Sequence, residues 1–267
     1  MGLDVYVGTL TRYYCGEWET ILQQVSETQF SSEPAPTPEE IALAARRAES
    51  LERLRAAAAQ IGAQVIGPED ARVITDRERR RLEKDLTAWR RRIARELKGR
   101  VRGVAYWDES PTAPYFTDKP GWDSYGALVL WAAHTENPEI PRPEKVESDW
   151  TRNRALEASA TGPGGSQFGQ LVNGPEIWLP FDFSATFETR DLFGKRVTVG
   201  SCQQLVRELN LLNDRTWRMG PKETGEILEK GPDPGGMLEP NAKFAMALFS
   251  SLGENALAHR LPMKLDY

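Results

Sequence analysis

Five side chains within one short stretch have the residue types that chemistry requires: Trp107, Asp108, Glu109, Tyr115 and Asp118. Two carboxyl groups with separated pKa values can act as general acid and general base. Aromatic rings beside them can hold a sugar, a nucleobase or a protein partner. We therefore take all five as candidate binding residues. If the protein is an enzyme, Asp108, Glu109 and Asp118 are the catalytic candidates.

The same stretch has a structural interpretation, which we favour over the catalytic one. Aromatic side chains in an ordered loop anchor that loop to the core, and prolines hold its backbone rigid. Asp123 follows Gly121 and Trp122 and precedes a long apolar run. Its carboxylate is therefore expected to cap the helix that starts there, with Trp122 largely buried. The loop is then a rigid segment with a polar outer surface.

An enzyme built on these carboxylates would be a hydrolase of a sugar or nucleotide substrate. It requires a deep pocket that holds at least two carboxyl groups. The candidates for such a pocket are Asp4, Asp108, Glu109, Asp118, Asp123 and Asp182.

Metal and nucleophile sites find little support. The only histidines, His134 and His259, have no second histidine three or four residues away, and no Cys-x-x-Cys pair occurs. We therefore expect no metal site and no cofactor. Cys202 lies at a predicted helix start, which can lower a thiol pKa, but a small buried residue is the favoured interpretation. The glycine-rich segment around Ser166 matches neither a nucleophile elbow nor a phosphate-binding loop.

Residues 76–102 are strongly basic, with twelve Lys and Arg against five Asp and Glu, in a chain whose net charge is −5. Such asymmetry can mark a nucleic-acid surface. The arginines alternate with acids around an apolar stripe, however, as on a solvated amphipathic helix. Nucleic-acid binding through residues 76–102 is thus the third hypothesis, and a disfavoured one.

Composition sets the class of protein. The 267 residues are 40% hydrophobic and 27% charged, which is ordinary for a soluble globular protein. The two cysteines, Cys15 and Cys202, are too few for a secreted disulfide scaffold. The chain begins without a signal-peptide pattern, and no apolar run is long enough to span a membrane. These features predict a cytoplasmic protein without membrane contact.

The elements that must position the candidate residues form an α+β fold. Alternating or apolar residues predict strands at 3–8, 63–67, 101–106 and 177–189, the last paired with 195–201. Helical spacing predicts helices at 17–29, 37–60, 76–97, from 123 or 124 onward, at 202–212 and at 241–258. Capping boxes mark the starts of two of them: Thr75 with Glu78 before 76–97, and Ser201 with Gln204 before 202–212. We expect one globular unit with a mixed sheet and packed helices. The glycine-rich loop 161–175 could mark a boundary within it.

Three stretches carry a resemblance: MGLDVYVGTLTRYY at the start, APYFTDKPGWDSYGALVLWAA in the middle, and IWLPFDF followed by VGSCQQLVREL. They resemble bacterial proteins of uncharacterised function that span most of this length, so the resemblance implies no catalytic residue. The mild acidity, the α+β layout and the lack of a catalytic signature also resemble immunity proteins of bacterial toxin systems.

The leading hypothesis is therefore a cytoplasmic binding protein whose partner is another protein. It could be a toxin-neutralising immunity protein, because acidic inhibitors capture basic partners by charge complementarity. The surface it would use is the acidic and aromatic one formed by Trp107, Asp108, Glu109, Tyr115 and Asp118. The sequence leaves the oligomeric state open.

Overall fold

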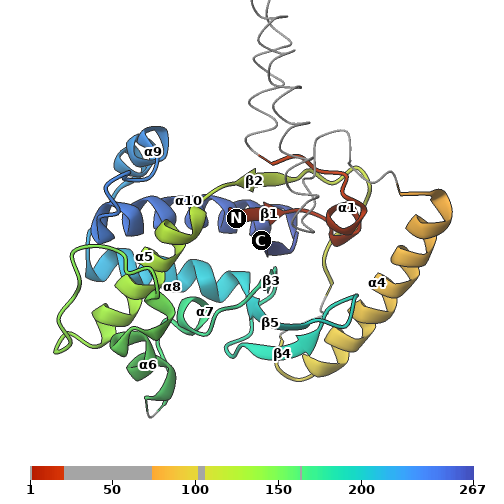
Figure 1. The fold of residues 1–267 in the computed structure, drawn as a ribbon. Coiled ribbons are helices and arrows are strands. Elements are labelled where there is room, and N and C mark those ends of the chain that lie inside the picture. Colours follow the sequence, from red (N-terminus) through yellow and green to blue (C-terminus); the bar gives the residue numbers. More distant parts are fainter. Residues whose placement is uncertain (1, 21–73, 102–105, 163) are drawn as a thin grey trace, which may run out of the picture.

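The computed structural model describes residues 2–20, 74–101, 106–162 and 164–267. Its centre is a six-stranded mixed sheet, which confirms the predicted α+β fold as one compact unit (Figure 1). The strands are β1 (Asp4–Val7), β2 (Phe116–Asp118), β3 (Ile177–Leu179), β4 (Phe187–Arg190), β5 (Arg196–Ser201) and β6 (Met263–Asp266). Their order across the sheet is β2-β1-β6-β3-β5-β4.

All neighbouring strands are antiparallel except β3 and β5, which run parallel. β6 lies between β1 and β3 and therefore joins the strands of the N-terminal part to those of the C-terminal part. Because β1 and β6 are neighbours, the two ends of the chain lie close together (Figure 1).

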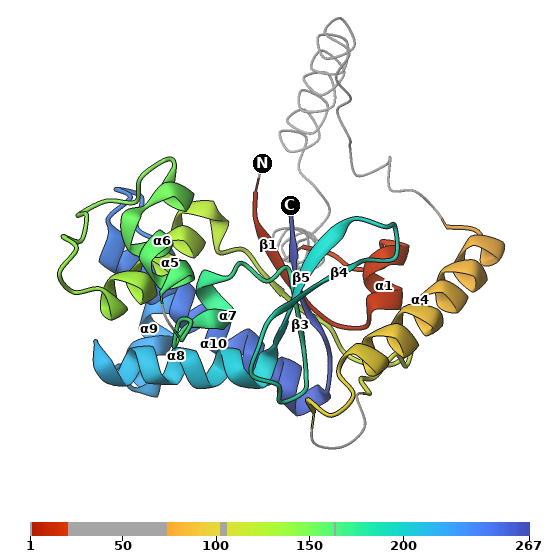
Figure 2. The same cartoon turned by 90° about the horizontal axis from the view of Figure 1, so that it is seen from below.

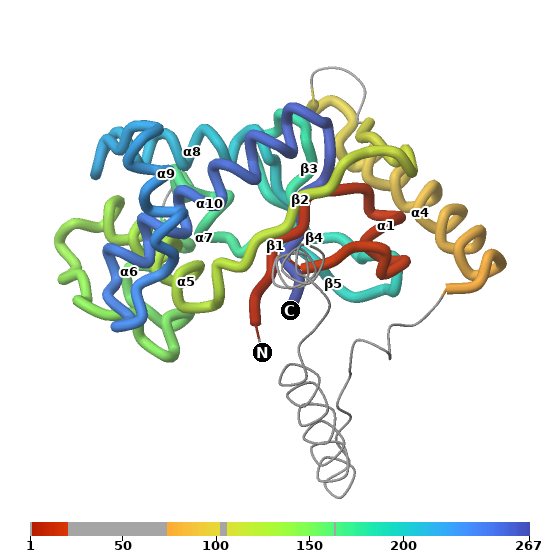
Figure 3. Tube along the Cα trace, turned by 90° about the horizontal axis from the view of Figure 1, so that it is seen from above, coloured from red at the N-terminus to blue at the C-terminus, as the bar shows by residue number. Residues whose placement is uncertain are grey.

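Helices cover both faces of the sheet, which Figure 2 shows between two groups of helices. One face carries α1 (Leu10–Cys15) and α4 (Asp76–Glu96). The other group is α5 (Gly121–Glu136), α6 (Arg154–Thr161), α7 (Gly169–Val172), α8 (Cys202–Arg215), α9 (Pro221–Lys230) and α10 (Leu238–His259), with a short 3-10 helix at Trp150–Arg152. Figure 3 shows the same separation from the opposite side.

Alternating side chains of the strands build two cores, because successive residues of a strand point to opposite faces. Val5, Val7 and Leu265 pack with the helices α5, α8 and α10. On the other face, Ile177 and Val199 pack with α4. The α4 residues in this second core are Leu86, Trp89 and Ile93.

Several predicted elements are confirmed. β1 lies within residues 3–8, and α4 begins with the capping box formed by Thr75 and Glu78. α8 begins after Ser201, whose hydroxyl accepts from the backbone N–H of Gln204. β4 and β5 form the predicted antiparallel pair, and α10 includes the predicted last helix.

Two predictions about the start of α5 are wrong. The helix begins at Gly121 after Pro120, and no side chain caps it, so Asp123 is an exposed residue of the first turn. Gly121 has φ 69°, a backbone shape that other residues resist and that turns the chain into the helix. Trp122 is only half-buried, and its ring packs against Tyr267, which is itself 49% exposed.

The segment 177–189 is not one strand. It divides into β3 and β4, which lie on either side of β5, because the chain leaves the sheet between Leu179 and Phe187. β2 and β6 were not predicted; they span only three and four residues. α9 was not predicted, because it lies in a stretch rich in glycine and proline.

Other predictions fall on residues outside the described ranges. These are most of the helix at 17–29, the helix at 37–60 and the strand at 63–67. Val101 and Tyr106, the ends of the predicted strand 101–106, belong to no strand, and the residues between them are outside the description. Within the described ranges, no helix is long and apolar enough to cross a membrane.

Two helical glycines provide a test of the packing. A Cβ atom at Gly126 in α5 would lie 2.6 Å from the indole Nε1 of Trp150, whereas at Gly225 in α9 it would meet nothing within 4 Å. We expect Gly126→Ala to lower the free energy of unfolding by about 1–3 kcal/mol through overpacking. Gly225→Ala should raise it by about 0.5–1 kcal/mol, because alanine is the better helix former. Urea unfolding of both variants measures this, and similar effects at both positions would contradict the packing around Trp150.

Candidate functional site

Glu109 joins the predicted loop to the start of α1. Its Oε1 accepts from the backbone N–H of Leu10 at 3.1 Å and from the indole N–H of Trp107 at 2.6 Å. Its Oε2 accepts from the N–H of Thr11 at 2.9 Å. A carboxylate at a helix N-terminus satisfies free amides and suits the positive end of the helix dipole. Glu109 therefore has a structural role that the sequence did not reveal.

Trp107 anchors the loop from inside. The side chain is fully buried, 5.7 Å from Trp89 and 5.9 Å from Phe181 between ring centroids. The ring of Trp107 thus belongs to the second core and is not part of the outer surface. This agrees with the structural interpretation of the loop aromatics.

The other two loop carboxylates also make local bonds. Asp108 is half-buried, and its Oδ1 accepts from the N–H of Ser110 at 2.8 Å in a tight turn. Asp118 lies on β2 opposite Val5, and its Oδ1 accepts from the N–H of Lys119 at 2.7 Å. Burial raises the pKa of Asp118 above its ordinary value. Asp108 and Asp118 both lie outside the pocket that Glu109 lines.

Arg12 of α1 fixes the second half of the loop. Its guanidinium donates to the carbonyl of Ala113 at 2.6 Å and to that of Pro111 at 2.8 Å. The same group lies 5.1 Å from the ring centroid of Tyr115, within the range of a cation–π contact. Tyr115 is half-buried and stacks on Tyr6 with centroids 6.2 Å apart.

Arg90 of α4 fixes the first half of the loop in the same way. Its Nη2 donates to the carbonyl of Trp107 at 2.7 Å. Its guanidinium lies 4.6 Å from the ring centroid of Tyr106. Tyr106 is 53% exposed, so the tyrosine is held in place while much of its surface faces solvent. The loop thus has one Arg–Tyr pair at each end.

A hollow of about 180 Å³ lies between α1, α4 and this loop. Arg12, Arg90 and Glu109 line it, together with the ion pair between Arg79 and Glu17. The other lining residues are Thr9, Thr11, Glu83, Leu86, Thr87 and Pro111. We call the hollow and its two Arg–Tyr pairs, Arg12–Tyr115 and Arg90–Tyr106, the loop surface.

Sequence reasoning missed Arg12, Arg90 and Tyr106. Arg90 directly follows Trp89 of the buried stripe. The helical spacing alone could therefore have placed Arg90 at the border of the buried face of α4. No spacing signal connects Arg12 with residues about a hundred positions further along the chain. Only the fold brings α1 against the loop.

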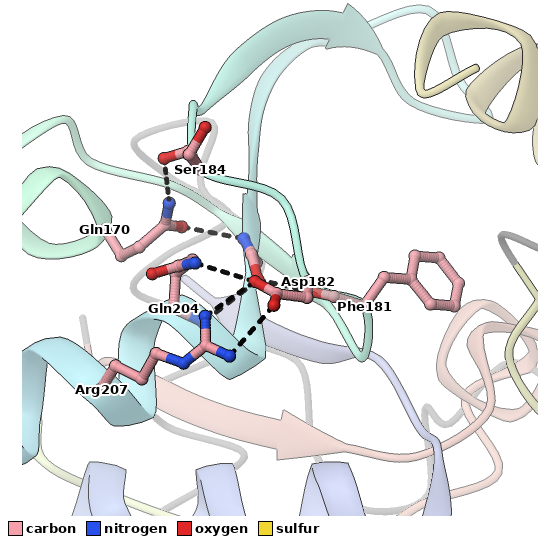
Figure 4. Close-up of polar contacts among 7 residues, drawn as sticks. Gln170, Phe181, Asp182, Ser184, Gln204 and Arg207 are labelled. Atoms are coloured by element: carbon pink, nitrogen blue, oxygen red, sulfur yellow. Dashed lines mark hydrogen bonds and ion pairs between the residues drawn. The ribbon is translucent and has the colours of Figure 1, made fainter. Parts of the chain in front are cut away.

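Asp182 lies in a different place, at the start of α8 (Figure 4). Its carboxylate pairs with the guanidinium of Arg207 at 2.9 and 3.0 Å and accepts from the amide of Gln204 at 2.8 Å. Behind it, the fully buried Gln170 accepts from the N–H of Ser201 at 2.8 Å and lies 3.5 Å from the carbonyl of Ser184. The carboxyl ends of the parallel strands β3 and β5, where ligands bind in many sheets, are thus filled by the protein's own side chains.

Asp4 is the candidate carboxylate that lies on β1. It is 8% exposed, and its Oδ2 lies 3.8 Å from the ammonium of Lys119. Burial raises the pKa of Asp4, and the nearby charges of Asp266 and Asp118 raise it further against the opposing effect of Lys119. Asp4 and Asp118 lie on the neighbouring strands β1 and β2, but the register places Asp118 opposite Val5 and Asp4 opposite Asp266.

Metal and thiol chemistry gain no support from the described residues. No group of His, Cys, Asp or Glu among them could hold a metal ion. Burial raises the pKa of the Cys202 thiol to about 12, and its Sγ lies 3.6 Å from the carbonyl of Gly253. Cys202 is thus the small buried residue that the sequence favoured.

Comparisons of this chain with protein-family models, curated proteins and solved structures found no match. Function must therefore be inferred from the geometry of the chain itself.

The role of Glu109 can be tested against a matched glutamate. We expect Glu109→Ala to lower the free energy of unfolding by about 1–3 kcal/mol, because three N–H donors lose their acceptor. Glu83→Ala, at an exposed residue that lines the same hollow, should change it by less than about 0.5 kcal/mol. Chemical denaturation gives both values. Equal losses would show that the cap contributes no particular stability.

Glu208 gives an expectation for pH. It is 9% exposed, and its Oε2 accepts from the N–H of Gln170 at 2.8 Å, which ties α8 to α7. Burial raises the pKa of Glu208 to about 8. The folded state therefore binds a proton more tightly than the unfolded chain, so this contribution to stability is complete below about pH 4.5 and is lost as the pH rises towards 8.

Glu208→Gln should remove that loss because the amide stays neutral at every pH. We expect the variant to gain stability relative to the parent protein by up to about 4 kcal/mol between pH 5 and 8.5. Urea unfolding at both pH values measures the difference, and other titrating groups cancel in it. If the free energy of unfolding changed equally with pH in the two proteins, Glu208 would not hold a proton in the folded state.

Proposed function

We propose that this protein is a binding protein that recognises another protein through the loop surface. The observation that carries the proposal is the pair of exposed or half-exposed tyrosines, Tyr106 and Tyr115, each held against an arginine beside a hollow. Tyrosine and arginine are enriched among the residues that dominate the energy of protein interfaces.

The rigidity of the surface supports binding. Arg12 and Arg90 each donate to backbone carbonyls of the loop and also contact a tyrosine ring. A side chain that is already fixed loses little conformational entropy when a partner docks. A hollow of about 180 Å³ is large enough for one side chain of the partner.

The bonds of Glu109 argue against catalysis at this loop. Both of its oxygens accept from N–H groups that are part of the fold. A general base must instead reach a proton of the substrate. Asp108 and Asp118 do not line the hollow. The three carboxylates therefore do not form one catalytic set around it.

A toxin-neutralising role in the cytoplasm is a narrower form of this proposal. The chain carries a net charge of −5, which steers a basic protein partner towards it. This version requires that the gene protect cells from a toxin encoded beside it. Absence of protection in a co-expression assay would leave the general binding role and remove the immunity role.

A carboxylate-dependent hydrolase of a sugar or nucleotide is the second candidate function. It is supported by Asp4, whose pKa is raised by burial and further by the charges of Asp266, its partner across β1 and β6, and Asp118. Carboxyl groups whose surroundings shift their pKa values are what acid/base catalysis uses. Loss of activity in Asp4→Asn with retained folding would support this function over simple binding.

Binding through the loop surface can be measured with single variants. The full chain is used to capture its partner from the native host, the partner is purified, and its affinity is measured by calorimetry. We expect Tyr106→Ala to weaken binding by about 30-fold or more, as for an interface hot spot. Phe193→Ala, at a residue that is 72% exposed on the β4–β5 turn, should change it less than about 3-fold. Equal affinities for both variants would place the interface elsewhere.

A further inference from the structure

The outer side of α4 carries a row of positive charges. Five exposed basic residues recur along it at steps of three, four and seven residues: Arg77, Arg80, Lys84, Arg91 and Arg95. At 100° per residue they fall within a sector of about 60° around the helix axis. We call these five residues the basic ridge.

The ridge lies opposite the buried stripe of α4. Leu86, Trp89 and Ile93 are at most 4% exposed and point into the second core. The same rotation of 100° per residue places the centre of the ridge about 180° from the centre of this stripe. Figure 2 shows α4 at the edge of the molecule, so its outer side is directed away from the sheet.

Acidic residues of α4 lie beside the ridge and not on it. Helical rotation places Asp76 and Glu83 on one flank and Glu78, Asp85 and Glu96 on the other. Acids and bases alternate along the chain, as the sequence showed, but they separate around the helix axis. The alternation along the sequence therefore does not argue against a nucleic-acid surface on this helix.

Within the described part of the chain, no acidic side chain forms an ion pair with a ridge residue. The arginines of α4 that pair with described acids are Arg79, with Glu17, and Arg81, with Asp85 at 3.9 Å. Neither belongs to the ridge. The five ridge side chains can therefore bind an external anion without breaking an ion pair within the described part of the chain.

The helix holds these charges at fixed spacing. The capping box of Thr75 and Glu78 secures its start, and the indole N–H of Trp89 donates to the carbonyl of Arg190 at 2.7 Å. Arg77 and Arg95 are separated by about 27 Å at 1.5 Å per residue. A straight row of charges of this length matches a ligand whose negative charges repeat regularly along a line.

We propose that the basic ridge binds the phosphate backbone of double-stranded nucleic acid. A duplex carries one negative charge per about 1.7 Å of its axis, and arginine binds phosphate oxygens in a bidentate manner. A membrane surface fits less well, because a helix that lies on lipid needs an exposed apolar face, and the apolar face of α4 is buried. The proposal is independent of the loop surface, and it predicts affinity without sequence preference.

The test is salt-dependent binding of the full chain to a labelled 30-base-pair duplex, made once as DNA and once as RNA, followed by fluorescence anisotropy. We expect binding at low salt with a slope of log K against log salt of about −3 to −4.5, as for three to five phosphate contacts. The triple variant Arg80→Gln, Lys84→Gln, Arg91→Gln should bind at least about 10-fold more weakly and reduce the slope by about 2–3.

A matched control removes three exposed charges elsewhere: Arg154→Gln, Lys222→Gln and Lys230→Gln, on α6 and α9. It changes the net charge equally and should bind as the parent does. If the ridge triple variant does not fold, the double variant Arg77→Gln, Arg95→Gln takes its place, with an expected weakening of about 5-fold or more.

Three results would overturn the proposal. The first is no binding of either duplex at 20 mM salt. The second is an equal loss of affinity in the ridge and control variants, which would mean that only net charge matters. The third is tighter binding of polyglutamate than of either duplex, which would make the ridge a surface for acidic proteins. A difference between the DNA and RNA arms identifies the type of duplex.

Discussion

The whole sheet depends on the pairing of β6, the last strand of the chain. β6 forms hydrogen-bonded pairs with β1 on one side and β3 on the other, and it is the link between β2-β1 and β3-β5-β4. Without the four residues of β6, the other described strands would form two separate sheets, each with an additional exposed edge. The six-stranded sheet therefore forms only when β6 pairs with β1. Pairing between segments so far apart in the sequence slows folding.

The packing on the second face of this sheet determines which side chains of the predicted loop face solvent. Its second face is covered by α1 and α4, and the loop at 106–115 crosses the gap between these helices. Trp107 and Glu109 turn inward to hold that crossing, one by burial and the other by capping α1. In the proposed binding role, the residues that remain to contact a partner are tyrosines and arginines, and not the carboxylates that suggested chemistry at first.

Charge is distributed in the fold more unevenly than the net value of −5 indicates. Acidic side chains serve as caps and buried acceptors, as Glu109 and Glu208 do. Positive side chains are instead gathered on the exposed side of α4. Because a helix needs only one apolar stripe for packing, its opposite side is free to collect charge of one sign. The loop surface and the basic ridge lie on two sides of this one helix.

The sequence by itself determined the elements whose signals are local. The apolar stripe and the capping box of Thr75 and Glu78 predicted α4, and Ser201 marked the start of α8, because helix signals act over three or four residues. Tertiary structure alone decided the positions of β2 and β6, the start of α5 at Gly121 and the role of Glu109. These depend on partners far away along the chain: Glu109 binds N–H groups 98 and 99 residues before it. No periodic pattern in a single sequence records such a partner, so the candidate carboxylates could be located but their roles could not be assigned.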